Sequence, residues 1–294
     1  MSAAAVNSAW AQEATVQPEE DHTSVLEDVE VRGRLRAEEV RRRVDAFIES
    51  NMAPPAGRPL ARWNQPVCLA TAQMSPAYAQ AFIDRIAEHI LAVGGDVGGP
   101  GCKPHVMVVG TRDGAAMARS LVLDDPRGYR PARGLTDRGS GALEAYQNSD
   151  APVRWWHVSL PVHVDTGQVA VRLDGEDYSV LPVRMASLLR TNIRDDLARV
   201  TIIIDFDKLP RGLRLGALAD YVAFVTLAQV NPDGDALGQD TILNLFRDPE
   251  GTTGLTQWDR EYLLGLYGVD QNLKSSRAHA RAIAGEVVRN RRDR

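Results

Sequence analysis

Residues 200–230 read VTIIIDFDKLPRGLRLGALADYVAFVTLAQV, a hydrophobic strand followed by a hydrophobic helix. Val200 to Phe206 is rich in β-branched residues and predicts a buried strand. Leu213 to Val230 is long enough for a helix, and apolar residues occupy almost every side of it. A helix without a polar face must be buried, so we expect this segment to lie at the centre of the core.

A strand–helix–strand unit occupies residues 66–110. Val67 to Ala70 and His105 to Gly110 have the apolar character of buried strands. Between them, Ser75-Pro76 provides an N-cap followed by proline at the first helical position. Apolar residues then recur at helical spacing, at Tyr78, Phe82, Ile83, Ile86, Ile90 and Val93. A right-handed crossover makes the two strands parallel, so we predict an α+β fold with a mixed sheet and packed helices.

We expect one domain, at residues 60–270, with an extension at each end. The 294 residues, 44% of them apolar, are enough for one large core. Residues 12–59 comprise an acidic, flexible lead-in and a charged helix from about Arg34 to Ser50, and residues 271–294 predict a basic C-terminal helix. No apolar run approaches the roughly 20 residues of a membrane-spanning helix, so we expect no transmembrane segment.

The N-terminal residues indicate export. Residues 1–11 end in Ala9-Trp10-Ala11, the small-x-small pattern read by signal peptidase, and are interpreted as the remnant of a signal peptide. They lack a basic n-region and a full apolar h-region, so a cytoplasmic protein with a flexible N-terminus is the alternative to a periplasmic or secreted one. The net charge of −5 makes nucleic acid a poor partner, and a protein of the cell envelope is the partner we consider.

The two cysteines, Cys68 and Cys102, are expected to form a disulfide. Each lies beside a predicted strand, and in an oxidising compartment a bridge that closes a loop of roughly 34 residues would stabilise the fold by about 3 to 4 kcal/mol. Two buried free thiols are the alternative. A zinc site is disfavoured, because neither cysteine has a second cysteine at ligand spacing and His105 leads into an apolar strand.

Three further motifs are explained more simply by a structural role than by a binding or catalytic one. Gly94 to Lys103 is glycine-rich, but it leads from a helix into a strand and lacks the Gly-Lys-Ser/Thr of a phosphate-binding loop. Trp155 and Trp156 face opposite sides of a strand, so we expect one in the core and the other at the surface or under a loop. His157 and His163 lack a third ligand at suitable spacing, and we expect no metal and no cofactor.

The end of the chain carries three elements in order: the buried helix, a short turn segment and a closing helix. The closing helix begins Leu-Thr-x-x-Asp at Leu255, with capping-box spacing, and ends Leu-Tyr-Gly at Gly268. Over residues 200–268 this order resembles the end of metzincin-type zinc metallopeptidases. With Trp63 to Cys68, the Gly-Cys-Lys-Pro-His turn and the Leu-Ala-Asp-Tyr helix, the whole body also resembles an uncharacterised exported family of alphaproteobacteria.

The helix departs from the metallopeptidase pattern. In that family it carries His-Glu-x-x-His, whose histidines hold zinc while the glutamate acts as general base. The corresponding stretch here is Asp220-Tyr221-Val222-Ala223-Phe224, in which Phe224 cannot bind a metal and Tyr221 replaces the base. The resemblance therefore implies a degenerate metallopeptidase-like C-terminal half without its zinc.

Three carboxylates are the candidate catalytic residues. Asp205 and Asp207 flank Phe206 at the end of a strand and are expected to point to the same side. Asp220 is the only carboxylate on the buried helix, and we expect it to be a capping or hydrogen-bonded structural carboxylate. Because no complete catalytic site is present, we expect a non-catalytic binding or structural function. The alternative is a hydrolase, related to peptidases, that uses these three carboxylates.

Overall fold

The structure is a computed structural model that describes most of the chain. The described residues are 22–132, 134–175 and 190–292, and of residues 22–35 the backbone alone is described. The expected signal-peptide remnant at residues 1–11 and the acidic lead-in as far as residue 21 therefore lie outside the described residues.

The chain divides into two compact units. The first ends at Glu39 and the second begins at Val40. Helix α1 (His22–Asn51) starts in the first unit, and Val44 and Phe47 near its end are fully buried in the second. The second unit holds the sheet and the other helices of the described residues.

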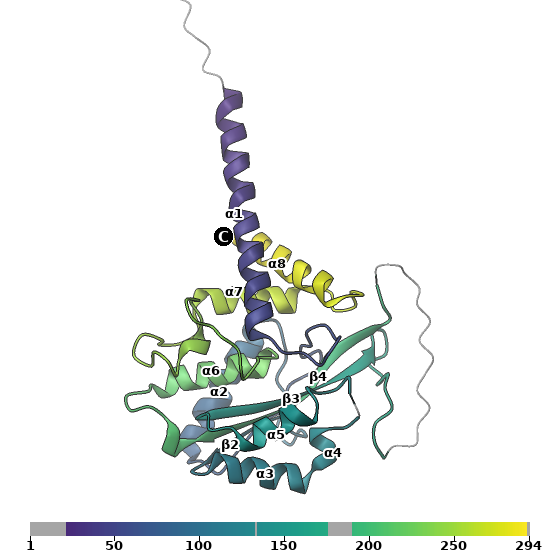
Figure 1. The fold of residues 1–294 in the computed structure, drawn as a ribbon, viewed down its shortest axis with the longest axis vertical. Helices are drawn as coiled ribbons and strands as arrows, with labels where there is room; N and C mark the ends of the chain where they lie inside the picture. Colours follow the sequence, from purple (N-terminus) through teal and green to yellow (C-terminus); the bar gives the residue numbers. More distant parts are fainter. Residues whose placement is uncertain (1–21, 133, 176–189, 293–294) are drawn as a thin grey trace, which may run out of the picture. The chain divides into compact units, whose positions relative to one another are not determined.

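A four-stranded mixed sheet forms the centre of the second unit (Figure 1). Its strands are β1 (Leu69–Ala72), β2 (Val106–Thr111), β3 (Val153–His163) and β4 (Ile193–Asp205). Their order is β1-β2-β4-β3, in which β1, β2 and β4 are parallel and β3 is antiparallel to β4. The predicted α+β fold with a mixed sheet is confirmed, as is the parallel pairing of β1 with β2. Strand β3 lies at one edge of the sheet.

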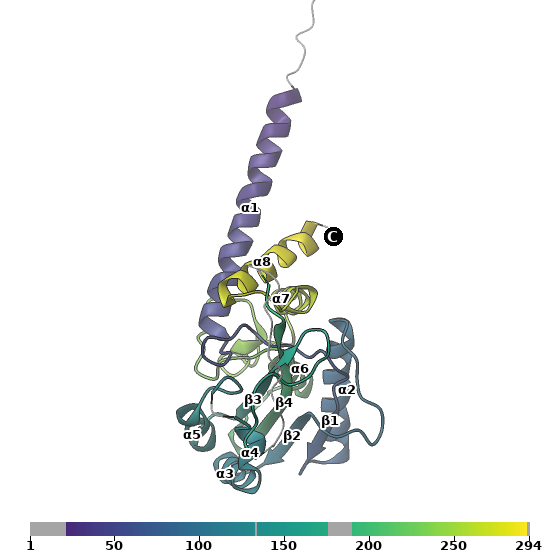
Figure 2. The ribbon, with the colours of Figure 1, turned by 90° about the vertical axis from the view of Figure 1, so that its right-hand side faces the viewer.

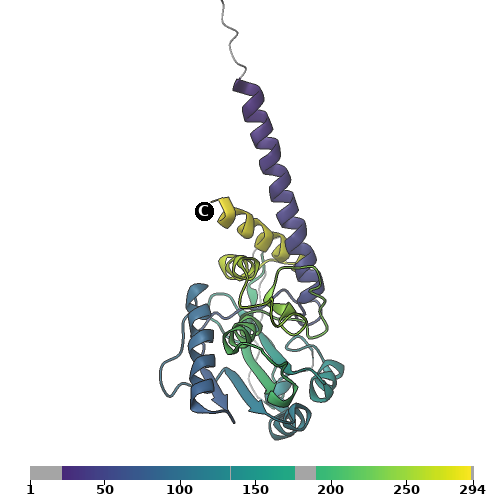
Figure 3. The same ribbon diagram turned by 90° about the vertical axis from the view of Figure 1, so that its left-hand side faces the viewer.

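Helices cover both faces of this sheet (Figures 2 and 3). They are α2 (Pro76–Ala92), α3 (Gly114–Asp124), α4 (Pro126–Tyr129), α5 (Ser140–Asn148), α6 (Leu215–Leu227), α7 (Gln257–Gly268) and α8 (Ser276–Arg292), with short 3₁₀ helices η1 (Phe206–Lys208) and η2 (Ile242–Asn244). Helices α2 and α6 lie on one face, and α3, α4 and α5 lie on the other. Each face therefore has its own apolar cluster, the larger one around α6.

The predicted central helix is confirmed. Helix α6 spans Leu215–Leu227, slightly less than the expected Leu213 to Val230, and every residue from Ala217 to Leu227 is buried. Phe224 is completely buried, and its ring meets that of Phe47 edge-on, with 6.4 Å between the ring centres. The helix needs no polar face, because every residue from Ala217 to Leu227 is buried.

Both tryptophans of β3 are in the core. Trp155 lies on the α6 side of the sheet, and its Nε1–H donates to the carbonyl of Val230 at 2.9 Å. Trp156 lies on the opposite side, and its Nε1–H donates to the carbonyl of Tyr129 at 2.8 Å. The expectation that one of them would lie at the surface or under a loop is wrong, because α4 and α5 cover the second face.

Three predicted local features are confirmed. Ser75 caps the start of α2 with its hydroxyl, and Thr256 and Asp259 form a reciprocal capping box at the start of α7. The disulfide joins Cys68, just before β1, to Cys102, in the loop before β2, with 5.9 Å between their Cα atoms. It therefore links the starts of two neighbouring parallel strands.

The basic C-terminal helix packs on the domain. Helix α8 buries Ile283 and Val287, and a Cβ atom placed on Gly265 of α7 would come within 2.7 Å of Val287. Residues beyond 270 thus contribute to the core of the second unit rather than forming a separate solvated extension. None of the helices in the described part of the chain has the length and hydrophobicity of a membrane span.

Candidate functional site

The two carboxylates at the end of β4 do not form a pair. Strand β4 ends at Asp205, and η1 turns the chain there, so the alternation of a strand does not continue to Asp207. Asp205 is 1% exposed, and its Oδ2 accepts a hydrogen bond from the N–H of Gly114 at the start of α3, 3.0 Å away. The side chain of Asp207 is 60% exposed and faces Arg112. The expectation that both carboxylates point to the same side is therefore wrong.

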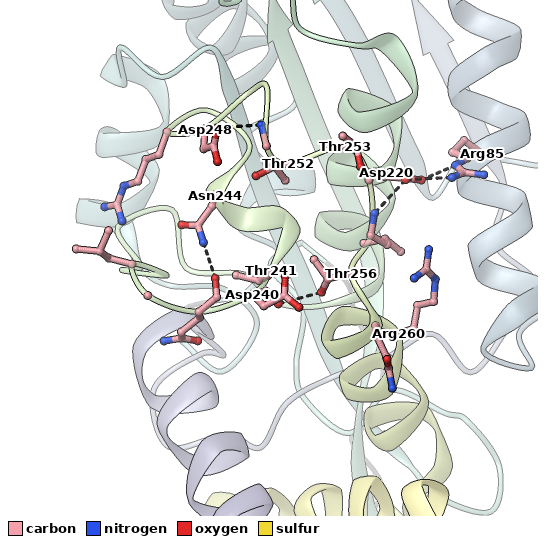
Figure 4. Close-up of a pocket in the computed structure, with 18 residues that line it drawn as sticks. Arg85, Asp220, Asp240, Thr241, Asn244, Asp248, Thr252, Thr253, Thr256 and Arg260 are labelled. Carbon is pink, nitrogen blue, oxygen red and sulfur yellow. Dashed lines mark hydrogen bonds and ion pairs between the residues drawn. The ribbon is translucent and has the colours of Figure 1, made fainter. Parts of the chain in front are cut away.

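Asp220 joins α6 to α2 and to the loop before α7 (Figure 4). Its Oδ1 accepts hydrogen bonds from the guanidinium of Arg85 and from Nε2 of His89, the latter at 2.7 Å. Its Oδ2 accepts from Nη2 of Arg85 at 3.0 Å and from the N–H of Leu255 at 3.1 Å. Each carboxylate oxygen thus accepts two hydrogen bonds, which is the capacity of an ionised carboxylate.

These contacts fix the charge of Asp220. Burial raises the pKa of this carboxyl, but the hydrogen bonds from His89, Arg85 and Leu255 more than offset burial and lower the pKa to about 2. The same ion pair raises the pKa of Arg85. A carboxylate with so low a pKa and no free lone pair is a poor general base and a poor metal ligand. The geometry favours the expected structural role for Asp220.

A polar pocket of about 840 Å³ lies beside Asp220 (Figure 4). Most of its wall is the loop of residues 237–257, and in Figure 4 Arg85 and Asp220 lie at one end of it while Asn244 and Asp248 lie at the other. Polar groups of this loop bond to one another: the Asn244 amide donates to the carbonyl of Gln239 at 2.7 Å. The pocket is therefore polar, and some of its polar groups already hydrogen-bond to one another.

The histidines of β3 do not build a metal centre. His157 is directed at α6, where its Nε2 lies 2.7 Å from the carbonyl of Val225. Burial lowers the pKa of His157 to about 4, so the ring is neutral and donates its N–H to that carbonyl. Among residues 22–132, 134–175 and 190–292, no three side chains of His, Cys, Asp or Glu are grouped to hold a metal ion.

A second pocket, of about 260 Å³, lies along the edge of β3 and is called the edge pocket here. Helix α5 forms one wall and the segments around Pro232 and Phe246 form the other, with Tyr221 of α6 between them. A smaller pocket of about 160 Å³ adjoins it, because the two share Trp155, Tyr221, Pro232 and Phe246 as lining residues. Together they make an aromatic groove beside the sheet.

The edge of β3 is unpaired where it borders this groove, although Val153 and Trp155 are only 2% and 6% exposed. The N–H of Asp205 donates to the carbonyl of Pro152 at 2.8 Å, so in the antiparallel ladder every second residue from 152 to 158 directs its main-chain groups toward β4. The main-chain groups of Val153, Trp155 and His157 therefore point away from β4. No other residue in the described part of the chain hydrogen-bonds to these groups.

The same edge is closed farther along. The N–H of Ser159 donates to the carbonyl of Thr136 at 2.9 Å, and the carbonyl of Pro161 accepts from Ala170 at 2.8 Å. The unpaired stretch is thus limited to residues 153–157. An ion pair crosses beside it, between Arg138, which precedes α5, and Asp233, which follows α6, at 3.5 Å.

The edge pocket was not predicted from the sequence. Its lining combines residues 138–156 with Tyr221, Pro232, Asp233 and Phe246, and the sequence indicated only that one of Trp155 and Trp156 would lie in the core. The aromatic strand that starts at Val153 is the one signal that could have drawn attention to it. No family model, no curated protein and no solved structure matches this chain, so the geometry alone supports the functional argument.

Proposed function

We propose that this protein is a non-catalytic binding protein that binds an extended peptide segment along the free edge of β3. The observation that carries the proposal is the unpaired main-chain edge of residues 153–157 beside an aromatic groove. A peptide that adds as a further strand supplies the missing hydrogen-bond partners, and the groove accepts one of its side chains.

The size of the edge pocket indicates what it accepts. Its volume of about 260 Å³ lies just below the roughly 300 to 1,000 Å³ of pockets that enclose a whole small-molecule ligand. One side chain of a longer ligand fits such a space better than a free metabolite does. Because Trp155, Tyr221 and Phe246 form its walls, a large apolar or aromatic side chain is the occupant we propose.

The proposal includes a degenerate metallopeptidase-like scaffold. In that resemblance, Tyr221 and Phe224 stand where the family has its general base and a zinc ligand, and Asp220 is already saturated by α2 and the loop before α7. The groove beside α6 then serves binding without cleavage.

The alternative, a hydrolase that uses Asp205, Asp207 and Asp220, has less support. Asp205 is buried against α3 while Asp207 is exposed, and the pKa of Asp220 is too low for a base. Elemental analysis of protein purified without chelator or affinity tag separates the two functions. Stoichiometric zinc, lost with a peptidase activity in Asp220→Asn, would favour the hydrolase.

We also propose that the protein acts in the periplasm or outside the cell, on a protein of the cell envelope. The disulfide between Cys68 and Cys102 supports this location, because disulfides persist in oxidising compartments, and the Ala9-Trp10-Ala11 pattern points the same way. Cell fractionation tests the proposal. Recovery of the protein in the cytoplasmic fraction with both thiols open to alkylation would contradict it.

The binding function is tested with a pool of fluorescein-labelled, C-amidated heptapeptides that have phenylalanine at the centre and mixed residues elsewhere. Ala145 on α5 lines the edge pocket and is exposed, so Ala145→Trp fills the pocket without disturbing the core. Glu144→Trp places the same side chain on the same helix, outside the lining.

Fluorescence anisotropy should show that wild type and Glu144→Trp bind the pool alike, whereas Ala145→Trp binds it at least tenfold more weakly. Failure of the wild-type protein to bind the pool contradicts the proposed function. Equal binding by Ala145→Trp contradicts its location at the edge pocket.

A further inference from the structure

We infer that the hydroxyl of Tyr221 is a specificity-determining hydrogen-bond donor, which binds an acceptor oxygen of a peptide added at the edge of β3. The inference rests on the proposed function and names the polar group by which the edge pocket recognises its ligand.

The position of Tyr221 places it at the centre of the groove. It projects from α6 and lines both the 260 Å³ and the 160 Å³ pockets. Its ring meets Trp155 edge-on on one side and Phe246 on the other, with 6.0 and 5.0 Å between ring centres. Held between two aromatic rings, the phenol has little freedom to turn away from the groove.

The hydroxyl of Tyr221 has no partner within the described part of the chain. Two other polar side chains in the groove are occupied, since the indole N–H of Trp155 binds the carbonyl of Val230 and Arg138 pairs with Asp233. The hydroxyl of Tyr146 and the Nε and Nη1 atoms of Arg154 also lack a partner among the described residues, but these atoms are sealed from solvent. Tyr221 as a residue is 6% exposed, and its unpaired hydroxyl is not sealed from the pocket. Its retention at a pocket wall is what a ligand-binding donor requires.

Tyr262 provides the contrast. Its hydroxyl also lacks a partner among the described residues, but the oxygen is sealed inside the core and the residue lines neither pocket. The hydroxyl of Tyr221 is not among the sealed atoms. The two tyrosines therefore share the same chemistry and differ in access to a ligand.

The chemistry of the donor defines the acceptor. Burial raises the pKa of Tyr221, so its hydroxyl stays protonated and donates. In an added strand, every second residue turns its carbonyl away from β3, and such a carbonyl needs a donor elsewhere. The ligand class is accordingly an extended peptide whose main-chain carbonyl lies beside the side chain that fills the edge pocket.

Tyr221→Phe and Tyr262→Phe test this inference, because each removes one hydroxyl and keeps the ring. The probe is the fluorescein-labelled heptapeptide pool with central phenylalanine. Tyr221→Phe should weaken binding about tenfold, the loss of one hydrogen bond, without lowering the midpoint of thermal unfolding. Tyr262→Phe should bind the pool as wild type does.

A second readout uses the wild-type protein. The ¹³Cζ resonance of Tyr221 should shift when the pool is added, and that of Tyr262 should not. Equal binding by Tyr221→Phe and wild type, or an unmoved ¹³Cζ resonance of Tyr221 at saturation, overturns the inference and leaves the proposed function standing. Absence of binding to the wild-type protein overturns both.

Discussion

The imidazole of His89 on α2 lies 2.7 Å from the carboxylate of Asp220 on α6, and the contact is buried. It joins the two helices that cover the same face of the sheet. Asp220 also accepts hydrogen bonds from Arg85 and from the N–H of Leu255. It therefore fixes the positions of α2, α6 and the start of α7 relative to one another. The carboxylate on the most buried helix of the fold is thus a structural group.

Replacing this carboxylate should destabilise the protein. Asp220→Asn keeps the shape of the side chain but removes the charge that faces Arg85 and His89, and we expect a loss of about 3 kcal/mol in the free energy of unfolding. Urea unfolding measures it. The control is Glu88→Gln, because the Glu88 side chain is 61% exposed and also pairs with Arg85; it should change stability by less than about 0.5 kcal/mol. Equal effects of the two variants would contradict this role for Asp220.

The low pKa of Asp220 predicts that the free energy of unfolding depends on pH. The pKa of Asp220 falls from an ordinary 3.8 to about 2 on folding, so the native state holds the charged form more strongly than the unfolded chain does. Its contribution of about 2 kcal/mol is complete above pH 4 and is lost as the pH falls toward 2. The difference in urea midpoint between wild type and Asp220→Asn should shrink over this window. A difference that stays constant from pH 5 to about pH 2 would refute the assignment.

Phe224→Ala should leave a cavity in the middle of the core. The side chain is completely buried on α6, and its removal should cost about 3 to 5 kcal/mol. Leu123→Ala is the control, because Leu123 is 81% exposed and its truncation should be nearly neutral. Thermal unfolding compares the two, and an unchanged midpoint for Phe224→Ala would show that α6 is not at the centre of the core.

Removing the disulfide should destabilise the fold without changing it. The bridge closes a loop of 34 residues, so the double variant Cys68→Ala, Cys102→Ala should lose about 3 to 4 kcal/mol. A reducing agent should destabilise the wild-type protein in the same way and leave the double variant unaffected. Mass spectrometry of non-reduced peptides checks the bridge itself, and two alkylatable thiols in protein isolated without reducing agent would refute it.

Local hydrophobic patterns predicted the parts of the fold that depend on one segment at a time. The periodicity from Tyr78 to Val93 identified α2, and the continuous apolar run identified α6, because each pattern reports directly on burial. The cap at Ser75 was equally readable, since one hydroxyl and the following proline define it. These elements confirm the α+β fold with its mixed sheet.

The other features depend on contacts between distant segments. Asp205 and Asp207 were expected side by side because strand alternation was extended one residue past the point where η1 begins. Trp156 is buried because α4 and α5 form in a stretch rich in Arg, Gly and Asp that carries a weak helical pattern. The groove around Tyr221 brings together residues more than sixty positions apart in the sequence. Hydrophobic periodicity describes one segment at a time, so it cannot predict that these residues lie close together.

Amide hydrogen exchange along β3, measured by NMR with and without the heptapeptide pool, tests strand addition most directly. In the free protein the amides of Arg154, Trp156 and Val158 should be protected, because they face β4, whereas those of Val153, Trp155 and His157 should exchange faster. Saturation with the pool should protect the second set and leave the first unchanged. Equal protection of both sets in the free protein, or no gain at Val153, Trp155 and His157 on adding the pool, would contradict the account.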